Sequence, residues 1–160
     1  TGPVLDGLPH LGDVLLLDYI LGNPDRRPDK NNYVAGGCQR NCEKRKGSAP
    51  HIGPMALVPI DQGSSFYTMD APAINLLTKG GSYCRFRKST ILRILHLRSE
   101  RAVQNKRSFY NELVLAAPKL VFDVVKWQRI SWAQDRLNAL AKHFERCIAQ
   151  YGAEKTQYWP

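Results

Sequence analysis

The chain has 160 residues, of which 43% are hydrophobic, and it carries 23 Lys and Arg against 14 Asp and Glu, a net charge of +9. This balance is typical of one domain with a buried core and excludes disordered, collagen-like and disulfide-scaffold proteins. An early apolar run, Val14 to Leu17, is interrupted by Asp18, and a bilayer span needs about 20 apolar residues. We therefore expect no transmembrane segment.

The first predicted element is a buried helix over Val14–Leu21. Asp13 is a candidate N-cap, and Gly22 followed by Asn23-Pro24 is typical of a helix end. The helix is therefore expected to deliver the chain into a polar loop.

Two short strands are predicted after this loop. Residues 33–35 form the first candidate, and Met55–Ile60 is predicted to be a buried strand. Residues 36–53 are rich in Gly, Ser, Pro and basic residues, so they are interpreted as an inserted loop. The pair is expected to form a short hairpin.

The second half is predicted to be helical. Ser89 or Thr90 can begin a basic helix over 91–103, and Ser108 begins a segment that is interrupted at Pro118. Ser131 begins a capping-box pattern before a last helix that ends at Gly152. Apolar residues at helical spacing form its expected buried stripe: Leu137, Leu140, Phe144, Cys147, Ile148 and Tyr151.

Two motifs follow the early elements. Asp25-Arg26 comes directly after the first helix, with Asn32 just before the first strand, and Asp61-Gln62-Gly63 ends the second strand, 29 residues past Asn32. Each motif alone is ordinary turn chemistry. Both together, in this order and each joined to an apolar element, resemble the catalytic and metal-binding loops of atypical kinases. That group includes the phosphoinositide 3- and 4-kinases, actin-fragmin kinase and the Golgi secretory-pathway kinases related to four-jointed.

The resemblance implies a role for each matching residue. Asp25 would be the catalytic base or the residue that orients the attacking hydroxyl, and Arg26 would hold its loop. Asn32 and Asp61 would bind Mg²⁺ (or Mn²⁺) together with ATP, and Gly63 would permit the turn that aims Asp61. The implied activity is phosphate transfer to a protein or lipid hydroxyl, and the sequence does not choose between these substrates.

The spacing of the first motif departs from the family pattern. In the phosphoinositide kinases the loop Asn usually falls five residues after the Asp, where this chain has Lys30. Asn31 and Asn32 are both candidates, and we favour Asn32 because it directly precedes the apolar pair Tyr33-Val34.

The expected fold is a mainly helical α+β domain over residues 1–160, similar to a kinase C-terminal lobe with a short β-hairpin that carries the catalytic and metal loops. The resemblance is specific over 13–63 and only compatible with the rest. The chain begins Thr-Gly-Pro-Val without an initiator Met, which indicates a processed chain or an excerpt. A kinase also needs a nucleotide-covering N-terminal lobe, so we do not expect activity from these residues alone.

The excess charge is local. Residues 1–78 sum to −1, residues 79–109 carry nine basic side chains and one acidic, and the helical tail over 110–160 sums to +2. The basic segment over 79–109 suggests an alternative function, a non-catalytic, pseudokinase-like module within a larger assembly, although charge runs are more often solvated faces. It would bind an acidic protein, a phosphoinositide or nucleic acid through Arg85, Arg87, Lys88, Arg93, Arg98 and Arg101.

The four cysteines allow three disulfide pairings. Cys38 and Cys42 could form a staple or half of a metal site with His51, although no second pair completes a zinc pattern. Cys147 lies on the apolar stripe and is expected to be a small core residue, whereas Cys84 stays open. The absence of an Asn-x-Ser/Thr sequon favours the cytoplasm over the secretory pathway without fixing the compartment.

Overall fold

The computed structural model describes residues 3–26, 30–37, 55–66, 83–99 and 108–158. Within these ranges the chain is mainly helical, with six helices and a small antiparallel sheet of two strands. The expected mainly helical α+β class is therefore confirmed. None of the described helices has the length and apolar character that a membrane span requires.

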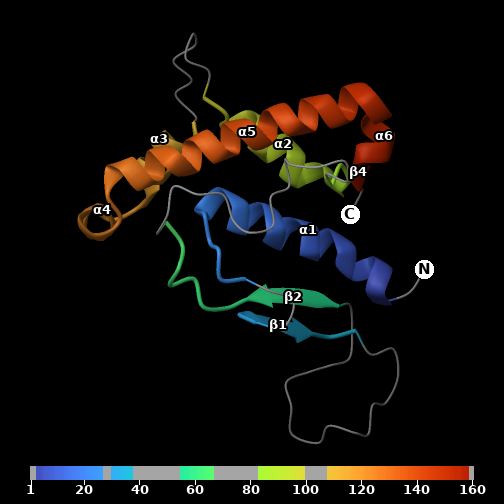
Figure 1. Cartoon of the computed structure of the whole chain (residues 1–160), viewed down its shortest axis with the longest axis horizontal. Coiled ribbons are helices and arrows are strands. Elements are labelled where there is room, and N and C mark those ends of the chain that lie inside the picture. Colours follow the sequence, from blue (N-terminus) through green and yellow to red (C-terminus); the bar gives the residue numbers. More distant parts are fainter. Residues whose placement is uncertain (1–2, 27–29, 38–54, 67–82, 100–107, 159–160) are drawn as a thin grey trace, which may run out of the picture.

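The helices are α1 (Pro3–Leu21), α2 (Lys88–Leu97), α3 (Phe109–Ala116), α4 (Lys119–Val124), α5 (Trp127–Tyr151) and α6 (Ala153–Thr156). The strands are β1 (Asn32–Ala35), β2 (Ala56–Pro59), β3 (Phe86–Arg87) and β4 (Gln157–Tyr158). β1 and β2 pair antiparallel, and β3 and β4 pair parallel. In Figure 1, α1 lies between the layer of α2 and α5 and the β1–β2 hairpin.

The core lies where α1, α2, β3 and α5 meet. The rings of Phe86 and Phe144 pack at its centre, 5.3 Å apart. The expected stripe of α5 is largely confirmed, because Leu137, Leu140, Phe144 and Cys147 are each at most 2% exposed, although Tyr151 is 48% exposed. Side chains from α1, α2 and α5 complete the cluster: Leu16, Tyr19, Ile20, Ile91, Ile94, Leu97, Ala133 and Ala141.

Several expected helix ends are confirmed. The Ser108 side chain accepts a hydrogen bond from the Asn111 amide at 3.2 Å and caps α3. Pro118 separates α3 from α4, and Gly152, with φ of 83°, ends α5. These ends were predictable because they depend on local capping chemistry.

The expected N-cap at Asp13 is wrong. α1 begins ten residues earlier, at Pro3, and continues through Pro9. Asp13 lies inside the helix, where its carboxylate accepts hydrogen bonds from Arg87 Nε at 2.9 Å and Thr90 Oγ1 at 2.6 Å. A tertiary contact to β3 and α2 therefore uses the oxygens that the local pattern assigned to capping.

The basic helix also differs from its prediction. α2 begins at Lys88 without a side-chain cap and ends at Leu97, and the rest of the predicted helix beyond Ser99 lies outside the described residues. Two side chains of α5 meet this end, because Gln134 Nε2 donates to the Leu97 carbonyl at 3.2 Å and the Ser99 amide donates to Asn138 Oδ1 at 3.0 Å. The neighbouring helix thus satisfies the backbone groups where α2 stops.

The second strand is less buried than the sequence predicts. In β2, Val58 is 41% exposed, and Ile60 just beyond the strand is 49% exposed.

The last long helix does not start at Ser131, as the sequence predicts. α5 starts at Trp127, whose ring stacks on Phe122 at 4.5 Å, and Ser131 is an exposed residue within the helix. Aromatic packing therefore extends α5 beyond the local capping signal.

Arg136 of α5 closes the C-terminal end of α1. Its Nε donates to the Ile20 carbonyl at 2.9 Å, and a cation interacts favourably with the negative end of a helix dipole. Burial lowers the pKa of Arg136 and raises the pKa of the neighbouring Tyr19 phenol, and the charge interaction between the two groups opposes both shifts. Through Arg136, α5 thereby helps to define where α1 ends and the loop after α1 begins.

We expect Gly22→Ala to lower the free energy of unfolding by about 2–4 kcal/mol, because it combines a backbone cost with a steric overlap. Gly22 has φ of 65°, which L-residues rarely adopt. An added Cβ would lie 2.8 Å from Arg136 Nη2, which is too close. Urea denaturation followed by circular dichroism measures the loss.

Gly22→Asn separates the two causes. Asn tolerates left-handed backbone better than Ala but still carries a Cβ. We expect the Asn variant to be nearly as destabilised as the Ala variant. If Asn restored most of the stability, the contact with Arg136 would not be what restricts this position to Gly.

Candidate functional site

A buried ion pair anchors the loop that follows α1. Arg26 Nε donates to Asp18 Oδ2 at 2.7 Å and Arg26 Nη2 donates to Asp18 Oδ1 at 3.1 Å, so the two groups meet through two hydrogen bonds. Each side chain is only 6% exposed. Such complete pairing offsets the cost of removing two charges from water.

The same guanidinium joins this loop to the segment that precedes Asp61. Arg26 Nη1 donates to the Ile60 carbonyl at 2.9 Å and also to the Asn31 carbonyl. The Asn31 carbonyl in turn accepts from the Ile60 amide at 3.0 Å, next to the end of the β1–β2 ladder. The loop of Asp25 and the strand end before Asp61 are therefore bonded to each other through Arg26.

Asn23 makes a second bridge between the two motifs. Its Nδ2 donates to Gln62 Oε1 at 3.3 Å and to Asp18 Oδ1 at 3.3 Å. Its Oδ1 accepts from the Asp25 amide at 3.1 Å, which forms a local turn. Asn23 is 1% exposed, so this buried amide links helix, loop and second motif.

The carboxylate of Asp25 is held by two neighbours in its own loop. Lys30 Nζ donates to its oxygens at 2.6 and 2.8 Å, and Asn31 Nδ2 donates to Oδ2 at 3.0 Å. The Asp25 side chain is 35% exposed and that of Lys30 is 51% exposed. The Asp25 carboxylate is therefore held in one orientation, and it forms an ion pair with the Lys30 ammonium group at a partly exposed position.

The two candidate asparagines lie differently. Asn31 has φ of 61° and directs its amide to Asp25, including the Asp25 carbonyl at 3.0 Å. Asn32 begins β1 opposite Pro59, and its Nδ2 donates to the Lys30 carbonyl at 3.0 Å. The side chain in contact with Asp25 is therefore Asn31, whereas Asn32 occupies the strand position favoured from the sequence.

Asp61 lies exposed just beyond β2. It adopts φ of 53°, and its Oδ1 accepts from the Gly63 amide at 3.2 Å. The left-handed residue of this turn is thus Asp61 itself. A Cβ on Gly63 would lie 3.2 Å from Asp61 Oδ1, so Gly63 serves by leaving space for the carboxylate.

Several residues of this network were absent from the sequence-based site. Asp18, Asn23, Lys30 and Gln62 are all engaged in it. Only Asp18 gave a signal, because a charge that interrupts an apolar helix needs a buried partner. The others are ordinary polar loop residues whose partners become visible only in the fold.

The basic segment is partly neutralised by acids from other elements. Arg87 pairs with Asp13 of α1, and Arg98 pairs with Glu145 of α5. Arg93 is exposed on α2, and Arg101 lies outside the described residues. These ion pairs leave less excess positive charge on this surface than the sequence segment suggests.

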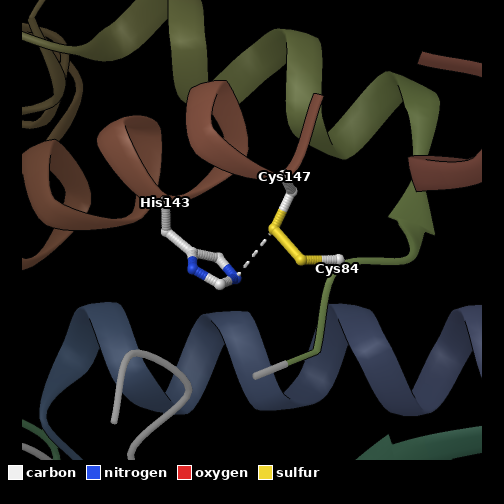
Figure 2. Close-up of side chains that lie close together, drawn as sticks. All are labelled: Cys84, His143 and Cys147. Carbon is white, nitrogen blue, oxygen red and sulfur yellow. Dashed lines mark hydrogen bonds between the residues drawn. A yellow bond between two sulfur atoms is a disulfide. The ribbon is translucent and has the colours of Figure 1, made fainter. Parts of the chain in front are cut away.

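A second cluster of side chains lies on the other side of α1 from the hairpin (Figure 2). Cys84 and Cys147 form a disulfide between the segment before β3 and α5. Cys147 is 2% exposed, as expected for a core position, but it is bonded to Cys84 and is not a simple packing residue. His143, one turn earlier on α5, places Nε2 3.4 Å from the Cys147 sulfur.

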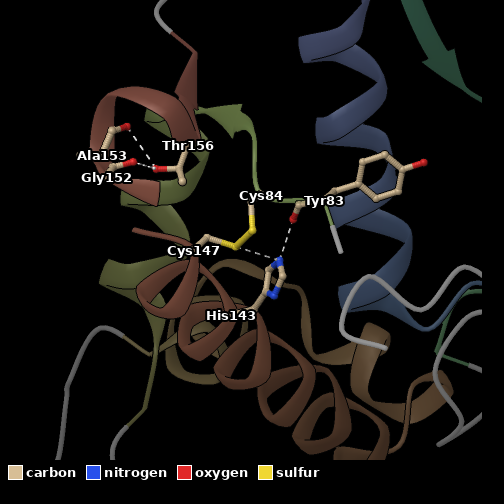
Figure 3. The surroundings of a disulfide bond; sticks show 7 residues. All are labelled: Tyr83, Cys84, His143, Cys147, Gly152, Ala153 and Thr156. Atoms are coloured by element: carbon tan, nitrogen blue, oxygen red, sulfur yellow. Dashed lines mark hydrogen bonds between the residues drawn. A yellow bond between two sulfur atoms is a disulfide. The ribbon is translucent and has the colours of Figure 1, made fainter. Parts of the chain in front are cut away.

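The spacing of these three side chains would suit a metal ion, since their ligand atoms lie within 4.8 Å of one another. Metal binding needs thiolates, however, and the disulfide uses both sulfurs. His143 Nε2 also lies 2.7 Å from the Tyr83 carbonyl (Figure 3), which can only accept a hydrogen bond, so this nitrogen carries a proton. We interpret the cluster as structural.

The other suggested metal ligands, Cys38, Cys42 and His51, lie outside the described residues. Near the disulfide, Thr156 Oγ1 donates to the carbonyls of Gly152 and Ala153 at 3.1 Å each (Figure 3). These bonds lie within α6 and its N-terminal cap. β4 follows directly after α6 and pairs with β3.

No protein-family model matches the chain, and no curated protein shows significant sequence similarity to it.

Proposed function

We propose that this chain is the C-terminal lobe of an ATP-dependent phosphotransferase that acts on a protein or lipid hydroxyl. The proposal is carried by the hydrogen bonds of Arg26, two to the Asp18 carboxylate and one to the Ile60 carbonyl. These bonds tie the loop of Asp25 to the segment that leads into Asp61. Phosphoryl transfer needs such joined loops, because a hydroxyl-orienting carboxylate and metal ligands must act on one phosphate.

In this proposal Asp25 orients the attacking hydroxyl and accepts its proton. Asp61 and Asn32 would hold Mg²⁺ (or Mn²⁺), and Asn31 is the alternative amide ligand. Carboxylate and amide oxygens are hard donors of the kind that Mg²⁺ prefers, so the residue types fit the ion. The bound ion would bridge and neutralise the phosphates of ATP.

Lys30 adds a residue that the sequence motif did not include. Its ammonium group is paired with Asp25. In this proposal the transferred phosphate would lie beside the same carboxylate. Lys commonly binds phosphate groups as a point charge, so its ammonium group can exchange the carboxylate for a phosphate oxygen. We propose that Lys30 turns to the phosphate and releases the Asp25 carboxylate for the hydroxyl.

An exposed apolar strip adjoins these residues. Tyr33 and Val58 are directly paired across the hairpin, and Ile60 follows Val58 by two positions, so the three share one face. They are 44%, 41% and 49% exposed. A purine ring or a second lobe covering this strip would bury that surface beside the metal ligands.

The Cys84–Cys147 disulfide supports an oxidising compartment for this phosphotransferase. Disulfides persist in secreted and lumenal proteins and are rare in the cytosol. The proposal therefore favours the secretory pathway, against the expectation from the missing sequon.

Titration with Mn²⁺ in the presence of ADP tests the metal site in the full-length protein. We expect Asp61→Asn to weaken Mn²⁺ binding by about tenfold or more, because the change removes one anionic ligand and keeps the shape of the side chain. The matched control is Asp123→Asn on α4, an exposed Asp outside the proposed site, which should leave the affinity unchanged. Electron paramagnetic resonance of free Mn²⁺ provides the measurement.

The result also separates the two functions considered. Equal Mn²⁺ affinity in wild type and Asp61→Asn would contradict the phosphotransferase. Binding of an acidic partner that survives Asp61→Asn and weakens steeply with salt would instead support the basic interaction module.

A further inference from the structure

Helices α3 and α4 expose apolar side chains that the fold does not cover. Neither helix contributes a buried residue. Leu115, Leu120 and Val124 are 82%, 72% and 73% exposed. We use "apolar tip" for Leu115, Leu120, Val121, Val124 and Trp127.

The apolar tip is held in place by aromatic packing. The rings of Phe122 and Trp127 stack with centroids 4.5 Å apart and planes 3° apart. Tyr110 of α3 packs on the same Trp127 at 5.9 Å. The stack joins α3, α4 and the start of α5, so the exposed side chains belong to one ordered unit.

The tip lies at one end of the molecule. Figure 1 shows α4 at the far end of the long axis, beyond the start of α5 and away from α6. A protruding apolar surface can enter the surface layer of a lipid bilayer, which does not need to offer a complementary groove. Its position therefore suits contact with an extended surface.

Basic residues flank the apolar positions. Lys119 begins α4 and Lys126 follows it, and both are exposed. Residues 113–130 carry three basic side chains and one acidic, Asp123. Lysines beside Leu, Val and Trp are the composition of segments that lie in the interface of an anionic bilayer, with Trp at the headgroup level.

We propose that the apolar tip docks on an anionic lipid bilayer. Leu120, Val124 and Trp127 would enter the boundary between headgroups and acyl chains, and Lys119 and Lys126 would contact lipid phosphates. A protein partner fits less well, because α4, the central helix of the tip, has six residues and is only about 9 Å long. A stable protein interface buries about 800 Å² on each partner, whereas three of the five tip residues lie on this one short helix.

Sedimentation with vesicles tests this inference. The oxidised full chain is mixed with vesicles of phosphatidylcholine alone or of phosphatidylcholine with phosphatidylserine. We expect binding to the anionic vesicles and a loss of about tenfold or more in Leu120→Glu/Val124→Glu. Lys119→Glu/Lys126→Glu should lose a similar amount, and added salt should weaken wild-type binding.

Two control variants make the test specific. Leu92→Glu changes an exposed leucine (51%) on α2 and should leave vesicle binding unchanged. Asp61→Asn should also bind vesicles normally, because the inference does not rest on the proposed phosphotransferase. Circular dichroism verifies that each variant is folded, which is expected because the changed side chains are exposed.

Three outcomes would overturn the inference. The first is anionic-vesicle binding that survives Leu120→Glu/Val124→Glu, which would assign binding to the basic segment. The second is the absence of binding to either kind of vesicle. The third is self-association of the wild type that Leu120→Glu/Val124→Glu abolishes while vesicle binding persists. This result would make the tip a contact between copies of the chain.

Discussion

Replacing both Cys84 and Cys147 by alanine should lower the free energy of unfolding by about 4 kcal/mol. The disulfide joins residues 63 positions apart, so it removes many conformations from the unfolded chain. Alanine is the suitable replacement because Cys147 is 2% exposed and a serine hydroxyl there would be buried. Urea denaturation of the oxidised proteins measures the difference.

Reduction provides the matched comparison. Dithiothreitol should destabilise the wild type by a similar amount, and it should have little effect on Cys84→Ala/Cys147→Ala. If dithiothreitol still destabilised Cys84→Ala/Cys147→Ala, the effect would have to come from the two remaining cysteines, Cys38 and Cys42. Equal urea midpoints for oxidised and reduced wild type would contradict a stabilising role of this disulfide.

Arg26→Ala should be comparably damaging, with a loss of about 3–5 kcal/mol, because it leaves the Asp18 carboxylate buried without its cationic partner. It also removes the hydrogen bond to the Ile60 carbonyl. If the two loops separate as a result, Mn²⁺ affinity should fall together with stability. Denaturation and Mn²⁺ titration of the same variant measure both effects.

Two further variants test whether geometry or charge is responsible. Arg26→Lys keeps the charge but offers one nitrogen in place of the three guanidinium nitrogens that meet Asp18 and the Ile60 carbonyl, so we expect it to recover less than half of the loss. Lys30→Ala removes an exposed ion pair with Asp25 and should cost less than about 1 kcal/mol. An Arg26→Ala protein as stable as Lys30→Ala would contradict the anchoring role of Arg26.

The two largest expected effects concern contacts that hold separate parts of the chain together. The disulfide fastens the segment before β3 to α5, and Arg26 fastens the loop after α1 to the end of β2. Arg136 connects the two regions, because it extends from α5 to the last turn of α1. The position of the candidate site therefore depends on α5 although none of its proposed ligands lies there.

The sequence by itself determined the features that depend on neighbouring residues. It placed the end of the first helix at Gly22, the cap of α3 at Ser108 and the end of the long helix at Gly152. Each is a choice of backbone angle or a hydrogen bond within a few positions. The order of Asp25 and Asp61 around a short hairpin was likewise readable from loops and apolar runs.

Only the tertiary structure decided which polar groups serve distant partners. Asp13 looked like a helix cap but pairs with Arg87, 74 positions away. Asp18 and Arg26 became a buried anchor, and Cys147 proved to be bonded to Cys84. A carboxylate or a thiol has the same local propensity whether its partner is water or a distant side chain, because the energy of such a pair depends on distance and burial, and these exist only in the folded chain.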